Sequence, residues 1–170
     1  MANLLFLTLL LLFHLACNCH GHASSCVYNQ TVANSRLSLN STGFYSGGGV
    51  CQNCTRNTTG INCETCIPLF FRAVGKSRSA IDVCTECNCS VLGSRLVPGV
   101  QFLDCVRDET VNISGLTAGD CYCKQNVHGK KCGVCRPEFY NLTQNNPFGC
   151  QGNKLMFIYL CIMLSASAIA

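Results

Sequence analysis

Cysteine is the residue type that could do chemistry in this chain, and its spacing is regular. The 170 residues include 17 cysteines, sixteen of which fall into two consecutive sets of eight. Each set opens with C-x-C and contains C-x8-C-x2-C. Thiols at such spacings can bind zinc, exchange with other thiols, or pair into permanent cross-links. The sets are Cys17, Cys19, Cys26, Cys51, Cys54, Cys63, Cys66 and Cys84, then Cys87, Cys89, Cys105, Cys121, Cys123, Cys132, Cys135 and Cys150.

The order of the cysteines favours cross-links over zinc. Structural zinc sites take four ligands in two separated pairs. These cysteines do not divide into such blocks, even with His20 and His22 beside Cys19. A thiol–disulfide oxidoreductase would need a strand–helix–strand context around C-x-x-C, which the sequence lacks. We therefore expect disulfides, no metal and no cofactor, and we interpret His20 and His22 as surface loop residues.

No set of acids, bases or nucleophiles indicates an enzyme. The carboxylates are spread along loops, and His128 is the lone histidine of the second half of the chain. Small disulfide-rich loops seldom enclose a pocket that excludes water. We therefore expect a non-enzymatic protein. The carboxylates are Glu64, Asp82, Glu86, Asp104, Asp108, Glu109, Asp120 and Glu138.

Seven N-glycosylation sequons indicate secretion into an oxidising compartment, where thiols pair. Five are ordinary sequons, and two carry Cys in the middle position. Glycosylated asparagines lie on the surface, so these positions predict exposed loops. The candidates are Asn29, Asn40, Asn57, Asn112 and Asn141, with Asn53 and Asn88 as the two that precede a Cys.

Basic residues are scattered through the chain, and the formal net charge is +4. Arg72, Lys76 and Arg78 form a loose cluster, and Lys130 and Lys131 form a pair. Each group could contact sulfated glycans or lie in a solvated loop. No pattern indicates nucleic-acid binding.

The N-terminal residues 1–16 are typical of a secretory signal peptide, because an apolar run over residues 4–13 is followed by the small residue Ala16 just before Cys17. Cleavage after Ala16 keeps every cysteine of the first set. An alternative cleavage after Ala23 would remove Cys17 and Cys19 and leave two partner cysteines unpaired.

The C-terminal residues 155–170 carry no charge. As a helix they would extend about 24 Å, short of the ~30 Å hydrocarbon core of a bilayer. Such a run is typical of a GPI-attachment signal, with Gly152 or Asn153 as the attachment residue. A short membrane span or a plain hydrophobic end are the alternatives. The seventeenth cysteine, Cys161, lies in this run.

An internal repeat shows how the cysteines are positioned. When Cys54 is aligned with Cys123, the residues between and after the cysteines also match. Modules of about 65 residues are too small for a large hydrophobic core, so cross-links must replace it. We expect short β-hairpins and loops with little helix. The matched pairs are Asn57 with Asn126, Gly60 with Gly129, Pro68 with Pro137, Phe70 with Phe139, and Phe71 with Tyr140.

The order C-x-C, C, C-x(1,2)-C-x8-C-x2-C, C resembles the laminin-type EGF-like module, and it does so twice. Cys17-Asn-Cys-His-Gly and Gly47-Gly-Gly-Val-Cys-Gln-Asn-Cys54 are similar to modules of laminin alpha short arms, and netrins and netrin-G carry similar runs. The resemblance predicts modules at residues 17–84 and 87–150. Only Thr85 and Glu86 separate them, so we expect end-to-end stacking into a semi-rigid rod.

The resemblance also implies which cysteines pair, because eight cysteines alone allow 105 arrangements. The family order is first with third, second with fourth, fifth with sixth, and seventh with eighth. The implied disulfides are Cys17–Cys26, Cys19–Cys51, Cys54–Cys63, Cys66–Cys84, Cys87–Cys105, Cys89–Cys121, Cys123–Cys132 and Cys135–Cys150.

Two functions follow from this resemblance as hypotheses. The first is a secreted structural or adhesive spacer of the extracellular matrix, whose partners are matrix or cell-surface proteins. The second is a GPI-anchored, netrin-G-like recognition protein on the outer face of the plasma membrane. A fragment of a longer laminin-like chain is a further alternative. Loop surfaces such as residues 27–50 and 106–120 would bind partners by shape, so the sequence does not identify the partner.

Overall fold

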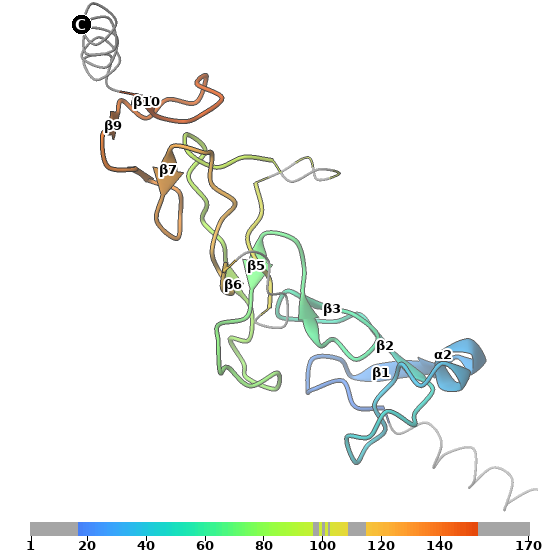
Figure 1. Ribbon diagram of the computed structural model, residues 1–170. Helices are drawn as coiled ribbons and strands as arrows, with labels where there is room; N and C mark the ends of the chain where they lie inside the picture. The colour runs from blue at the N-terminus through green and yellow to red at the C-terminus, as the bar shows by residue number, and fades with distance from the viewer. Residues whose placement is uncertain (1–16, 97–98, 100, 102, 109–114, 153–170) are drawn as a thin grey trace, which may run out of the picture. The chain divides into compact units, whose positions relative to one another are not determined.

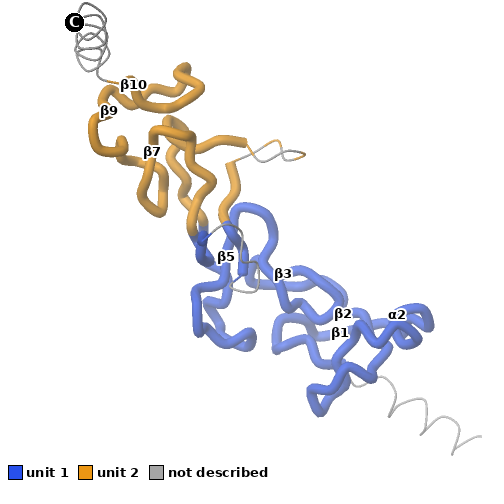
Figure 2. The backbone as a smooth tube through the Cα atoms, in the orientation of Figure 1, with its two compact units in different colours: residues 1–86, 106–119 blue, residues 87–105, 120–170 orange. Residues whose placement is uncertain are grey.

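The computed structural model describes residues 17–96, 99, 101, 103–108 and 115–152. The chain divides into two compact units (Figure 2), and each disulfide lies within one of them. Unit 1 comprises residues 1–86 and 106–119, and unit 2 comprises residues 87–105 and 120–170. The predicted signal peptide 1–16, the apolar run 155–170, Asn112 and Asn153 lie outside the described residues.

Unit 1 consists of three antiparallel strand pairs and one short helix (Figure 1). Strand β1 pairs with β2, β3 with β4, and β5 with β6. The helix α2 follows Asn29, whose side chain accepts a hydrogen bond from the Val32 amide and caps the helix. The elements are β1 (Ser25–Tyr28), α2 (Gln30–Asn34), β2 (Gly49–Gln52), β3 (Thr58–Thr59), β4 (Thr65–Cys66), β5 (Phe70–Phe71) and β6 (Thr85–Glu86).

Unit 2 contains two further antiparallel pairs, β7 with β8 and β9 with β10. The elements are β7 (Val127–His128), β8 (Val134–Cys135), β9 (Phe139–Tyr140) and β10 (Gln151–Gly152). The prediction of short hairpins and loops with little helix is confirmed. No helix within the described part of the chain has the length and apolar character needed to cross a membrane.

The buried apolar side chains of both units are mainly half-cystines. Leu39 and Val83 in unit 1, and Val127 in unit 2, are among the few buried aliphatic residues. Because so little aliphatic surface is buried, covalent bonds supply most of the restraint on the folded chain. The buried cysteines are Cys19, Cys51, Cys63, Cys66, Cys87, Cys105, Cys121, Cys132 and Cys150.

Candidate binding surfaces

Eight disulfides cross-link the described chain. They join the cysteines in the pairs that the family resemblance implies, four in the first set and four in the second. The loop closed by the fifth and sixth cysteines has a sequence separation of 9 in both sets. The bonds are Cys17–Cys26, Cys19–Cys51, Cys54–Cys63, Cys66–Cys84, Cys87–Cys105, Cys89–Cys121, Cys123–Cys132 and Cys135–Cys150.

Each set of eight cysteines contains an equivalent hairpin. We name the two copies hairpin 1 (residues 54–67) and hairpin 2 (residues 123–136). In hairpin 1 the Cys63 amide donates to the Gly60 carbonyl at 3.3 Å, and in hairpin 2 Cys132 donates to Gly129 at 3.0 Å. Both glycines have positive φ, +102° and +87°, which only glycine adopts without strain. The sequence repeat therefore predicts a tight turn that the structure confirms.

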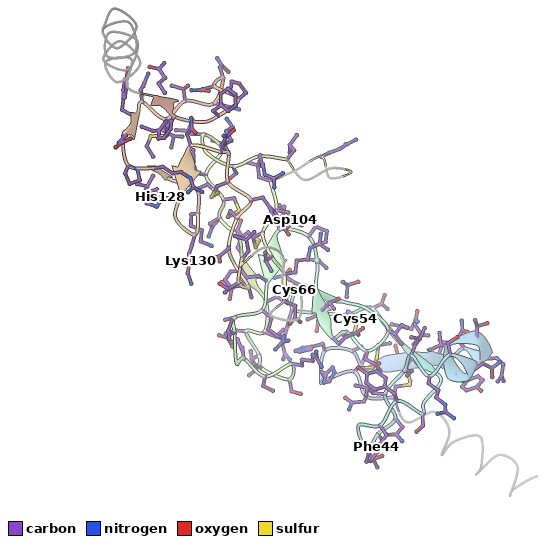
Figure 3. All side chains as sticks on the ribbon, in the orientation of Figure 1. Phe44, Cys54, Cys66, Asp104, His128 and Lys130 are labelled. Carbon is purple, nitrogen blue, oxygen red and sulfur yellow. A yellow bond between two sulfur atoms is a disulfide. The ribbon has the colours of Figure 1, made fainter. Side chains whose placement is uncertain are left out.

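Hairpin 1 and hairpin 2 differ in the side chains that they carry. Thr59 and Ile61 of hairpin 1 correspond to His128 and Lys130 of hairpin 2, at equal distances from the first cysteine. His128 and Lys130 are exposed and lie on the segment around β7 and β8 (Figure 3). The backbone is therefore conserved between the copies while the charge is not.

Two members of the basic cluster at Arg72, Lys76 and Arg78 pair with carboxylates within unit 1. Arg72 is buried and donates to both carboxylate oxygens of Asp108 at 2.7 and 2.8 Å. The Lys76 ammonium lies 2.5 Å from a carboxylate oxygen of Asp82. The guanidinium of Arg72 is therefore held inside unit 1, whereas Lys76 and Arg78 are half-buried.

His22 corrects the expectation of a surface loop. Its side chain is buried, at 1% relative exposure, and its Nε2 lies 2.5 Å from the Arg78 carbonyl oxygen. The Nδ1 atom faces the Arg56 guanidinium at 3.4 Å. His22 is therefore an internal tie between segments 56 residues apart, which sequence spacing does not reveal.

His20 is half-buried next to this tie. Burial lowers the pKa of His20 below its ordinary value of 6.5, and the positive charge of Arg78 lowers it further. The neutral ring is thereby favoured in the folded state.

Six of the seven predicted glycosylation asparagines lie among the described residues. Five of them are exposed, and Asn40 is half-buried. Four have left-handed backbone conformation, with φ between +50° and +60°, which asparagine tolerates better than most residues. Those four are Asn53, Asn57, Asn88 and Asn141. Gly152, a predicted attachment residue, is exposed and pairs with Phe139.

An aromatic turn in unit 1 was not evident from the sequence. The Asn40 side-chain oxygen accepts hydrogen bonds from the Thr42 amide, the Thr42 hydroxyl and the Phe44 amide. These bonds hold a compact turn that leaves Phe44 and Tyr45 exposed at 69% and 57% (Figure 3 labels Phe44). The turn lies in the loop 27–50 that we expected to bind partners.

Part of the second predicted loop, 106–120, belongs to unit 1. The Arg72 amide donates to the Arg107 carbonyl at 2.8 Å, beside the ion pair with Asp108. A Cβ atom at Gly119 would lie 2.5 Å from the Phe71 ring, so this position needs glycine. Residues 109–114 lie outside the description, but residues 106–108 and 115–119 complete unit 1.

A hollow in unit 1 lies beside the first disulfides. The hollow lined by the first cysteines, with a volume of about 330 Å³, is open and carries no titratable side chain. Its lining residues are Cys17, Cys19, Ala23, Ser24, Ser25 and Cys26.

Comparison with known proteins identifies this arrangement. Residues 17–80 and 84–150 each match the laminin EGF domain family. Human usherin is 41% identical over 134 residues, human laminin subunit alpha-3 is 40% identical over 126, and mouse laminin subunit alpha-1 is 41% identical over 135. These alignments cover 79%, 74% and 79% of this chain but only 2%, 3% and 4% of the relatives.

Proposed function

The chain belongs to the laminin EGF domain family, and from this premise we propose that it is a secreted, N-glycosylated structural protein of the extracellular matrix. It has no catalytic role in this proposal, and it acts as a spacer that presents loops to matrix or cell-surface proteins. The observation that carries the proposal is the framework of eight disulfides, which forms and persists in an oxidising compartment.

The module boundaries 17–84 and 87–150, the rod-like stacking and the glycosylation of the seven sequons are parts of this proposal. The exposed asparagines support glycosylation, because a glycan needs room outside the fold. The relatives compared above are laminins and usherin, and they give no specific support to a netrin-G-like reading, so we do not pursue it.

Peptide mapping without reduction is the primary test. The full chain would be expressed in secretory mammalian cells, and the medium would be collected. We expect oxidised protein with the eight disulfides above and a mass that falls after enzymatic removal of N-glycans. Retention inside the cell with free thiols would contradict the proposal.

In a second form of this proposal, a GPI lipid anchor is attached at Gly152 or Asn153. The protein then stays on the outer face of the plasma membrane. Phosphoinositide-specific phospholipase should then release it from intact cells. If the protein remains on the cells after this enzyme and after salt washing, the anchor is excluded. If it is found only in the medium before treatment, plain secretion is the correct form.

A further inference from the structure

Hairpin 2 concentrates positive charge that hairpin 1 lacks. Hairpin 1 contains one Arg and one Glu, whereas hairpin 2 contains four Lys or Arg residues and no Asp or Glu. The strand pairing and the disulfide loop are the same in both copies, so the backbone does not demand the charge. The cationic residues of hairpin 2 are Lys124, Lys130, Lys131 and Arg136.

Two of these cations hold the base of hairpin 2. The Lys124 ammonium donates to the carbonyls of Leu92, Gln144 and Asn146 at 2.9, 2.8 and 3.0 Å. The Lys131 ammonium donates to the Cys87 carbonyl. Neutral carbonyls accept these bonds, which hold the two ammonium groups at the base of hairpin 2.

Lys130 and Arg136 are exposed, as is Lys131. Lys130 is exposed in the turn of hairpin 2 (Figure 3), and His128 is exposed beside it. Arg136 is exposed, and its Nε donates to the Gln125 carbonyl at 2.9 Å, which holds the guanidinium next to the hairpin. Exposed cationic side chains attract a flexible anionic chain through their charge.

The carboxylates of unit 2 lie outside hairpin 2. Asp104 is buried and accepts from the Cys105 amide at 2.9 Å. Asp120 is half-buried, and Glu138 is exposed two residues beyond the hairpin. Of these three carboxylates, Glu138 is the exposed one.

We propose that hairpin 2 binds a sulfated glycosaminoglycan, with Lys130, Arg136 and His128 contacting the sulfates and with the charge of Lys124 adding to the local positive potential. This inference rests on the proposed function for its extracellular setting and adds a partner class to it. A basic hairpin in that setting matches a repeating polyanion by charge.

The shape of hairpin 2 favours a polysaccharide over an acidic protein. Stable protein interfaces bury about 800 Å² on each partner and rely on aromatic anchors. Hairpin 2 has strands of two residues and contains no Phe, Tyr or Trp. A linear polyanion needs only a narrow ridge of cations.

The test uses the secreted, oxidised full chain, with heparin as the probe. Lys130→Gln should weaken heparin affinity by about two- to fivefold, the range for one exposed charge pair, and adding Arg136→Gln by roughly tenfold. Both variants should reduce the salt dependence of binding, because fewer counterions are released. Lys76→Gln in unit 1 is the matched control, since it changes the net charge equally and should leave the affinity unchanged.

A gain-of-function variant separates the effect of charge from a loss of binding caused by misfolding of hairpin 2. Ile61→Lys places a cation in hairpin 1 at the position of Lys130, and it should raise heparin affinity in a protein whose hairpin 2 is untouched. Chemically desulfated heparin and hyaluronan should bind at least tenfold more weakly than heparin if sulfates are the ligands.

Several results would overturn the inference while leaving the proposed function intact. One is a secreted, fully disulfide-bonded protein that does not bind heparin. Another is an equal loss of affinity from Lys76→Gln and Lys130→Gln, which would assign binding to net charge alone. Capture of an acidic protein by hairpin 2 without heparin binding would assign the surface to the other partner class. Failure of secretion or oxidation, in contrast, would count against the proposed function.

Discussion

Unit 1 and unit 2 close the base of the same hairpin with different side chains. In unit 1 the Thr55 amide donates to the His22 carbonyl at 2.8 Å, and in unit 2 the Lys124 amide donates to the Gly93 carbonyl at 2.8 Å. His22 fills the space in unit 1 with a buried ring. Gly93 in unit 2 has no space for a side chain, because a Cβ there would lie 2.0 Å from the Cys132 carbonyl oxygen. Two modules with the same disulfide pattern and the same backbone hydrogen bond can therefore pack different side chains at this position.

A second difference lies just after the paired aromatic residues. Arg72 of unit 1 is buried with Asp108, whereas Asn141, 69 residues later at the equivalent position, is exposed and heads a sequon. Unit 1 thus contains a buried ion pair where unit 2 presents a surface asparagine. The same sequence position is buried in an ion pair in one copy and exposed at the surface in the other.

The largest expected effect is on this ion pair. Arg72→Met would leave the buried Asp108 carboxylate without its cation and should lower the free energy of unfolding of unit 1 by about 3–5 kcal/mol. Asn141→Met is the matched control in unit 2 and should change stability by less than about 0.5 kcal/mol. Denaturant titration followed by hydrogen exchange within each unit measures both. Equal losses of stability from Arg72→Met and Asn141→Met would contradict this difference between the two units.

The shared disulfide loop should respond equally in the two units. Removing Cys54–Cys63 or Cys123–Cys132 by paired Cys→Ser changes should each cost about 2.5 kcal/mol, because both loops have a separation of 9. Protease sensitivity resolved to each unit would measure the losses. A difference of more than about 1 kcal/mol would mean that side-chain packing, and not loop closure, dominates.

The close approach at Gly93 should make unit 2 sensitive to one methyl group. Gly93→Ala sets a Cβ against backbone that cannot yield cheaply, and it should destabilise unit 2 by about 1–3 kcal/mol. Gly133→Ala, where nothing lies within 4 Å of the added Cβ, is the control. Thermal unfolding of the two variants side by side decides the matter, and similar midpoints would refute the steric account.

The smallest expected effect is a pH dependence confined to unit 1. The pKa of His20 is lowered in the folded state by burial and by Arg78. The unfolded chain therefore takes up a proton first as pH falls below about 6.5, so unit 1 should lose stability slightly on acidification through that range. His20→Gln should remove this part of the dependence in hydrogen-exchange measurements at pH 7 and pH 5. An unchanged dependence in the variant would exclude His20 as its source.

Local patterns predicted the features that depend on neighbours in the chain. The spacing around Cys54 and Cys123 indicated the repeated loop, and Gly60 and Gly129 indicated its tight turn, because turn chemistry acts over a few residues. The family resemblance supplied the disulfide pairs. The turn at Asn40, which exposes Phe44, has no strong sequence signal, since its hydrogen bonds use residues that occur in many loops.

The sequence by itself determined the composition of the framework: sixteen cysteines in two ordered sets, sequons, and a basic segment in the second copy. Only the tertiary structure decided which polar residues turn inward. Arg72 meets Asp108 across 36 residues, and His22 meets Arg78 across 56. Such contacts depend on where cross-linked loops fold back in space, and residue type does not reveal whether a charge ends beside a partner or in water.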